Sequence, residues 1–188
     1  MAERWRFRWP DWTRLFLHLA AVNVVSNLME PLAGLIDTAY LGHLSDIRHL
    51  AGVAIAGVAF NFIYWSFSFL RLGITGTTAQ ATGRGDEDKA IEIALRYGVI
   101  ALIAGLALLI LHPLLRELAF ALLQGTAEVK ASGREYFNAR ILSAPANLML
   151  MAISGWFLGR ARSSAVLLLT GIGSFSNIAF NYGFVVYL

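Results

Sequence analysis

The 188 residues are 57% hydrophobic and only 14% charged, and their mean hydropathy is +0.62. Soluble globular proteins contain about 25% charged residues. The composition therefore excludes a soluble domain and predicts an integral membrane protein built from spans of about 20 residues. The net charge of +3 does not indicate nucleic-acid binding, because the basic residues lie between apolar runs rather than in one patch.

The N-terminal segment, residues 1–14, interleaves arginine with tryptophan and phenylalanine. Such side chains suit the headgroup layer of a bilayer, so we expect a basic and aromatic segment at the cytoplasmic surface. The apolar run that follows contains polar residues and no A-x-A cleavage site, which argues against a signal peptide. It predicts a retained first span at about residues 15–44.

The first span contains a carboxylate, Asp37, in an otherwise apolar stretch. An Asp at the centre of a membrane helix costs about 2.5–3.5 kcal/mol on insertion scales, so it usually faces a protein interior or a water-filled cavity. We predict that Asp37 binds an ion or a proton, the alternative being a purely structural pairing within the bundle. Asn27 and Glu30 fall on the same narrow stripe at about 100° per residue and are predicted to line the cavity.

The second and third spans are predicted at about residues 50–82 and 91–112. The second is uncharged as far as Arg71, whose stem we expect to reach a membrane interface. The third has no strongly polar residue in its middle and is expected to face lipid or other helices. Residues 112–135 combine an amphipathic run with Gly125 and Gly133, which favours a short surface helix followed by turns.

The fourth span is predicted at about residues 136–159. Polar residues occupy a stripe about 60° wide along it: Tyr136, Arg140, Ser143, Asn147 and Ser154. We expect Pro145 to bend this helix. Gly155 and Gly159 form a GxxxG face that favours close approach of another helix.

The fifth span, at about residues 163–188, carries Asn177 and Asn181 on one face with Thr170 and Ser174. The polar stripes of the first, fourth and fifth spans would together form the cavity that Asp37 needs. The two asparagines either line this cavity or hydrogen-bond between helices. Arg140 is either a topology residue or a charge partner for an acidic group.

The distribution of basic residues favours a cytoplasmic N-terminus. That orientation places Arg4, Arg6, Arg8, Arg14, Arg84, Lys89, Arg160 and Arg162 inside, against Arg48, Arg116, Lys130 and Arg134 outside. The last span then ends on the outer side at an apolar residue, which predicts that the chain is truncated.

The sequence offers little support for an enzyme. It contains no nucleophile with a base and an orienting group, no glycine-rich phosphate loop and no His/Glu metal motif. The absence of cysteine excludes a disulfide framework and a cysteine-based metal site. His43, Asp46 and His49 lie close together in the sequence, but metal binding there would need a third strong ligand and a preformed geometry. We therefore expect no cofactor and no metal, apart from a coupling ion.

Four stretches carry a resemblance to a known family: PLAGLIDTAYLGHL (31–44), LAGVAIAGVAFNFIYWSFSFLRLGITGTTAQATGRGD (50–86), REYFNARILSAPANLMLMAISGWFLGRA (134–161) and SFSNIAFNYGFVVYL (174–188). In this order they resemble the first five helices of multidrug and toxic compound extrusion (MATE) transporters. The resemblance is to the branch named for DNA-damage-inducible protein F (DinF). It extends from about residue 13 to 188, and its Asp-Thr, Leu-Gly-His and Leu-Arg-x-Gly-x-Thr-Gly elements are fairly specific in combination.

The resemblance implies an all-α membrane protein whose family has twelve helices in two six-helix lobes. It also implies an antiporter that exports organic cations, drugs or metabolites in exchange for H⁺ or Na⁺. By this similarity Asp37 matches the first-helix acid of the cation site and Asn177 matches an asparagine of the fifth helix. Tyr136 and Arg140 match a Tyr and an Arg of the fourth helix. Asn181 stands where the family often has an acid, which weakens a two-carboxylate sodium site.

The five spans correspond to an incomplete N-terminal lobe in the inner (plasma) membrane. Transport is therefore expected to need a sixth helix and a second lobe, which makes the chain a fragment or a degenerate remnant. The expected partners are a small organic substrate, cationic or amphipathic, and the lipid bilayer. Two other functions remain open from the sequence: a flippase for lipid-linked oligosaccharides, and a small membrane subunit that does not transport.

Overall fold

The protein is described by a computed structural model, which covers residues 47–187 and single positions between residues 13 and 32; for residues 177–187 it describes the backbone alone. The described residues form helices and contain no strand. Three helical stretches are long and apolar enough to cross a membrane: Leu50–Gly83, Glu87–Leu122 and Ala127–Gly159. The all-α membrane fold predicted from the sequence is therefore confirmed.

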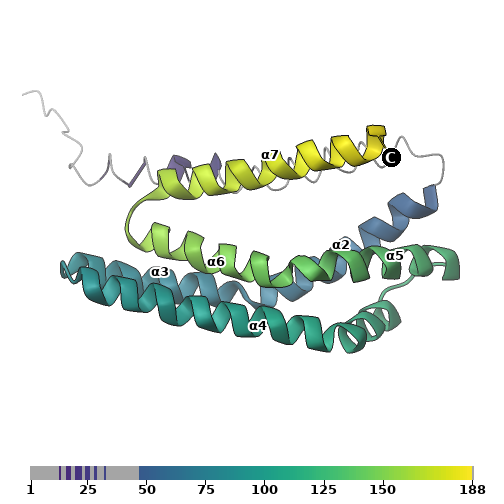
Figure 1. The fold of residues 1–188 in the computed structure, drawn as a ribbon, viewed down its shortest axis with the longest axis horizontal. Helices are drawn as coiled ribbons and strands as arrows, with labels where there is room; N and C mark the ends of the chain where they lie inside the picture. The colour runs from purple at the N-terminus through teal and green to yellow at the C-terminus, as the bar shows by residue number, and fades with distance from the viewer. Residues whose placement is uncertain are drawn as a thin grey trace, which may run out of the picture.

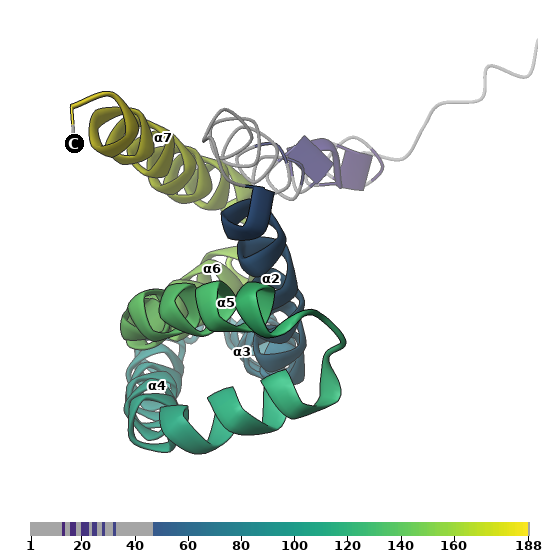
Figure 2. The same cartoon turned by 90° about the vertical axis from the view of Figure 1, so that its right-hand side faces the viewer.

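The described helices are α2 (Ile47–Ser66), α3 (Ser68–Gly83), α4 (Glu87–Leu122), α5 (Ala127–Arg140), the 3₁₀ turn η1 (Ile141–Ser143), α6 (Ala144–Gly159) and α7 (Ser163–Tyr187). In Figure 1, α2 continues into α3 and α5 into α6, and the chain reverses direction before α4, between α4 and α5, and before α7. Helix α2 packs on α5, α3 packs on α6, and α4 packs on both α3 and α6. Helix α7 runs outside this group in both views (Figures 1 and 2).

Aromatic rings fill the core where α2, α4 and α5 meet. Phe60 of α2 stacks on Phe137 of α5 with ring centroids 4.7 Å apart, and Phe120 of α4 meets Phe137 edge-on at 6.2 Å. All three side chains are fully buried. Large apolar side chains such as Trp65 and Ile110 are exposed on the outer surface, which suits contact with lipid rather than water.

The second and fourth spans are each interrupted. Between α2 and α3, the N–H of Phe67 donates to Tyr64 O in a 3.0 Å turn bond. Between α5 and α6 the expected interruption near Pro145 is found as the turn η1, because proline cannot donate the backbone bond that would continue an α-helix. Since α2 packs on α5 and α3 on α6, the two interruptions lie side by side in the bundle.

The GxxxG face of α6 is in close contact with another helix, as predicted, and that helix is α3. A Cβ on Gly155 would clash with the side chain of Ile74 and lie 2.8 Å from Arg71 O, and a Cβ on Gly159 would lie 2.7 Å from Thr75 O. The hydroxyl of Thr75 donates across the interface to Gly155 O at 3.1 Å. The two glycines therefore allow backbone contact between the helices, which a larger side chain would prevent.

The segment expected to form a separate surface helix is the C-terminal part of α4 followed by the start of α5. Helix α4 continues past residue 112 to Leu122, and this part turns across the end of the bundle (Figure 2). Arg134 of α5 forms an ion pair with Glu117 of α4 at 3.0 Å and covers the ring of Phe120. Gly133 was expected in a turn but lies inside α5. A Cβ at this position would lie 2.7 Å from the Phe120 ring, so a larger residue would clash there.

Helix α4 passes through Pro113 because a side chain replaces the missing backbone donor. Proline has no N–H, so the carbonyl four residues earlier, Leu109 O, loses its helical partner. The ring nitrogen Nδ1 of His112 lies 3.1 Å from that oxygen and, when protonated, donates to it. The third span, predicted at about residues 91–112, therefore continues as a helix to Leu122.

We expect His112→Leu to lower the stability of the protein by about 1–2 kcal/mol, because Leu109 O is then left without a donor. For a chain of this size the midpoint of thermal unfolding in detergent falls by about 2–8 °C. The double variant His112→Leu/Pro113→Ala restores a backbone N–H at position 113 and should recover most of the loss. An equal loss in the single and double variants would contradict this account.

Candidate functional site

Two groups of hydrogen-bonded polar side chains meet at η1 and are linked through the backbone oxygen of Arg140. The guanidinium of Arg140 donates from Nη1 to Tyr136 Oη at 3.0 Å. Asn147 Nδ2 donates to Ser143 Oγ and to Tyr64 Oη, both at 3.0 Å. We call these five residues, Tyr64, Tyr136, Arg140, Ser143 and Asn147, the polar string. It joins α2 to α5, η1 and α6.

The interruption in the fourth span positions the string. Ser143 Oγ donates to Arg140 O at 2.8 Å and so satisfies a carbonyl at the end of α5. A serine also bonds to a backbone oxygen at the break between α2 and α3, where Ser66 Oγ donates to Phe62 O at 2.9 Å. Serine bonds of this kind bend helices. Irregular backbone at membrane depth is tolerated where it is buried in protein or lines a cavity.

Arg140 is held by aromatic rings as well as by its hydrogen bond. Its Cζ lies 5.1 Å from the centroid of the Phe60 ring and 5.8 Å from that of Tyr136. The side chains of Arg140 and Ser143 are exposed, whereas Tyr64, Tyr136 and Asn147 are partly buried. The string thus presents a cation and hydroxyl and amide groups on a surface that protein does not cover in the described part of the chain.

The depth of Arg140 in the span matters because lipid does not solvate charge. It lies about 20 Å along the helix from Ala127 and about 30 Å from Gly159, at 1.5 Å per α-helical residue and 2.0 Å in the 3₁₀ turn. Helix α5 is polar and helix α6 is apolar, so Arg140 lies at the polar edge of the apolar part of this span. A long basic side chain at such an edge reaches the membrane interface or a water-filled cavity.

The structure brings together four of the residues singled out in the fourth span: Tyr136, Arg140, Ser143 and Asn147. Ser154, expected on the same stripe, is buried beside the GxxxG face instead. Ser154 lies only about 20° from Asn147 on α6, so its burial comes from the packing of α3 on this part of the helix and not from a change of face. Tyr64 was missed by the sequence analysis, although a phenolic hydroxyl inside an apolar span normally needs a partner.

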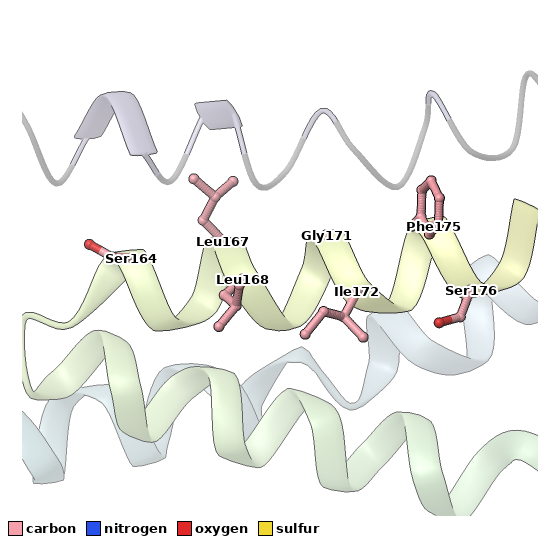
Figure 3. A pocket seen from close by; sticks show the side chains of 7 residues that line it. All are labelled: Ser164, Leu167, Leu168, Gly171, Ile172, Phe175 and Ser176. Carbon is pink, nitrogen blue, oxygen red and sulfur yellow. The ribbon is translucent and has the colours of Figure 1, made fainter.

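A separate apolar cleft of about 460 Å³ lies along α7 (Figure 3). It is lined by Ser164, Leu167, Leu168, Gly171, Ile172, Phe175 and Ser176. Thr170 and Ser174, predicted to face the cavity, do not line this cleft and are partly buried. Its lining is almost entirely apolar, so it offers no second polar site.

The remaining predicted site residues lie outside the described part of the chain. These are Asn27, Glu30 and Asp37 of the first span, and the side chains of Asn177 and Asn181 in α7. The candidate metal ligands His43 and Asp46, and the side chain of His49, also lie outside it. Among the residues that the structure does describe, no three His, Asp or Glu side chains are grouped to hold a metal ion.

Comparison with known proteins gives a family match and three relatives. The family model MatE matches residues 23–183, well over half of the chain. DNA damage-inducible protein F of Escherichia coli is 34% identical over 169 residues, which are 90% of this chain and 37% of the relative. No solved structure matches the chain significantly.

Two further relatives are named as probable multidrug resistance protein NorM. The one from Thermotoga maritima is 28% identical over 179 residues, covering 94% of this chain and 38% of the relative. The one from Synechococcus is 25% identical over 167 residues, covering 89% of this chain and 36% of the relative. The chain thus spans less than two-fifths of the length of each of these relatives. With its long apolar helices and a family match that covers most of its length, the chain is a multi-pass membrane protein that belongs to the MatE family, as its motifs predicted.

Proposed function

We propose that the chain forms the N-terminal part of a secondary active antiporter that exports small organic compounds in exchange for H⁺ or Na⁺. Membership of the MatE family supports the transport class, and the two NorM relatives are named as multidrug resistance proteins. The observation that carries the proposal is the polar string where α5 meets the apolar helix α6. Such groups at membrane depth mark substrate and ion pathways.

Asp37 is the proposed coupling site, which binds H⁺ or Na⁺ from one side of the membrane and releases it to the other. Asn177 and Asn181, together with Asn27 and Glu30, would line the same cavity. The polar string supplies the part of that lining which belongs to the second and fourth spans. The substrate would be a cationic or amphipathic molecule that enters from the cell or from the bilayer.

Alternating access requires two halves that rock about a site between them. We therefore propose that transport needs a sixth helix and a second lobe beyond these 188 residues. We also propose the inner (plasma) membrane as the location, with the N-terminus in the cytoplasm. This orientation is supported by the basic residues that it places on the inner side.

The test is transport by the full-length protein in phosphatidylcholine vesicles with ethidium as the substrate. An imposed H⁺ or Na⁺ gradient should drive ethidium across the membrane against its concentration difference. Comparison of the two gradients identifies the coupling ion. Ethidium movement no faster than in protein-free vesicles under either gradient would refute the antiporter.

A further inference from the structure

Arg140, like Arg71, Arg84 and Arg162, has no carboxylate partner among the described residues, but of these four only Arg140 is held by a tyrosine hydroxyl and aromatic rings. Arg96, Arg134 and Arg160 each form an ion pair with a glutamate. Arg140 instead has one hydrogen bond, to Tyr136 Oη, and two contacts with aromatic rings. A guanidinium has five N–H donors, so most of its donor capacity remains available.

The sequence of the surrounding helices explains the missing partner. Helices α2, α3, α6 and α7 contain no Asp or Glu at all. The acids of α4 lie near its two ends, and those of α5 are Glu128 and Glu135, neither of which pairs with Arg140. None of the described helices therefore supplies a counter-charge at the level of Arg140.

The contacts that hold Arg140 also orient it. The rings of Phe60 and Tyr136 lie against the guanidinium, and the bond to Tyr136 Oη restricts its rotation. A planar guanidinium with free N–H groups matches a carboxylate or phosphate through two parallel hydrogen bonds. Because little freedom is left to lose on binding, such a group is preorganised for an oxyanion.

We infer that Arg140 binds an oxyanion group, a carboxylate or a phosphate, carried by the transported amphipathic molecule. The residue thereby adds affinity for a zwitterionic substrate over the matching plain cation, which the carrier still transports as proposed above. This inference rests on the proposed transport function and adds a substrate class to it. Tyr64 and Tyr136, which are only partly buried, lie on the same side and offer aromatic edges to the rest of such a molecule.

The competing explanation is that Arg140 pairs with an acid of the protein itself, such as Asp37. In that case replacement of Arg140 would disturb the site for every substrate alike. In the substrate-binding case it would affect only compounds that carry the anionic group. The two explanations can therefore be distinguished by how replacement of Arg140 changes the binding of two substrates that differ only in one negative charge.

Rhodamine 110 and its methyl ester, rhodamine 123, form such a pair, because esterification removes only the carboxylate charge. Binding of each dye to the full-length protein is measured by fluorescence anisotropy in nanodiscs of phosphatidylcholine, which contain no anionic lipid. The wild-type protein should prefer rhodamine 110. In Arg140→Gln the ratio of the two affinities should fall about tenfold, the loss of a charge-assisted pair.

Two further variants control for charge and shape. Arg140→Lys keeps the positive charge but loses the planar guanidinium, which can form two parallel hydrogen bonds. The ratio of the two dye affinities should therefore fall by about threefold. Arg162→Gln removes the same charge from the exposed turn between α6 and α7 and should leave the ratio unchanged. An equal effect of Arg140→Gln on both dyes, or a wild-type protein without a preference, would overturn the inference. Gradient-driven ethidium transport by the wild-type protein reports separately on the proposed function.

Discussion

Replacement of Gly155 by leucine is expected to abolish the packing of α6 on α3 and to lower the yield of folded protein severely. The added side chain would clash with Ile74, which is fully buried, and with the backbone oxygen and Cα of Arg71. Overpacking usually costs about 1–3 kcal/mol and more where backbone must move. We expect at least about 3 kcal/mol, a large fraction of the 5–15 kcal/mol typical of whole proteins.

The measurement is the amount of monodisperse protein recovered in detergent, together with its thermal unfolding midpoint. Gly76→Leu on α3 is the matched control, because no atom lies within 4 Å of the position that its Cβ would occupy. That variant should be recovered like the wild-type protein. Normal recovery of Gly155→Leu would show that α3 and α6 do not pack through their backbones.

The α3–α6 contact illustrates what could be predicted from the sequence. Two glycines four residues apart in an apolar span leave a flat stripe, and close approach of another helix is its usual consequence. The sequence did not reveal which helix would lie there. That choice depends on the turns and on the lengths of α3 and α6, which place Thr75 and Thr78 opposite Gly155 and Gly159.

Part of the candidate site followed from helical periodicity and part did not. Tyr136 and Arg140 are four residues apart in one regular helix, so a fixed angle per residue was enough to place them together. The same angle did not show which part of that face would be covered, since Ser154 lies about 20° from Asn147 on α6 but is buried where α3 packs on this helix. The partnership of Asn147 with Tyr64 links residues 83 positions apart, and no local rule predicts it.

The extension of α4 beyond residue 112 shows a second limit of local rules. A proline that follows a long apolar run normally ends the helix or bends it at that position. Here the side chain before the proline, His112, provides the donor that the backbone lacks, and α4 continues to Leu122. The rule treats each residue type separately, whereas this outcome depends on a side chain bonding to a particular carbonyl.

The largest functional effect is expected from Asp37→Asn in the full-length protein. The substitution keeps nearly the same size and hydrogen-bonding capacity but removes the group that we propose to take up and release H⁺ or Na⁺. Substrate that enters the cavity would then no longer be exchanged against an ion. Gradient-driven ethidium transport should fall to the level of protein-free vesicles. The amount of protein in the membrane should stay within about twofold of wild type, because a polar amide costs less free energy in a membrane span than a charge does.

Asp86→Asn is the matched control for the loss of one carboxylate. Asp86 caps the first turn of α4 through a 2.9 Å bond from Lys89 N–H, at an exposed position between α3 and α4. Asparagine is as good an N-cap as aspartate, so this variant should transport like the wild-type protein. If Asp37→Asn transports at the wild-type rate under the same gradient, Asp37 is not the coupling site. Loss of transport in both variants would assign the effect to net charge instead, since the two substitutions share only that change.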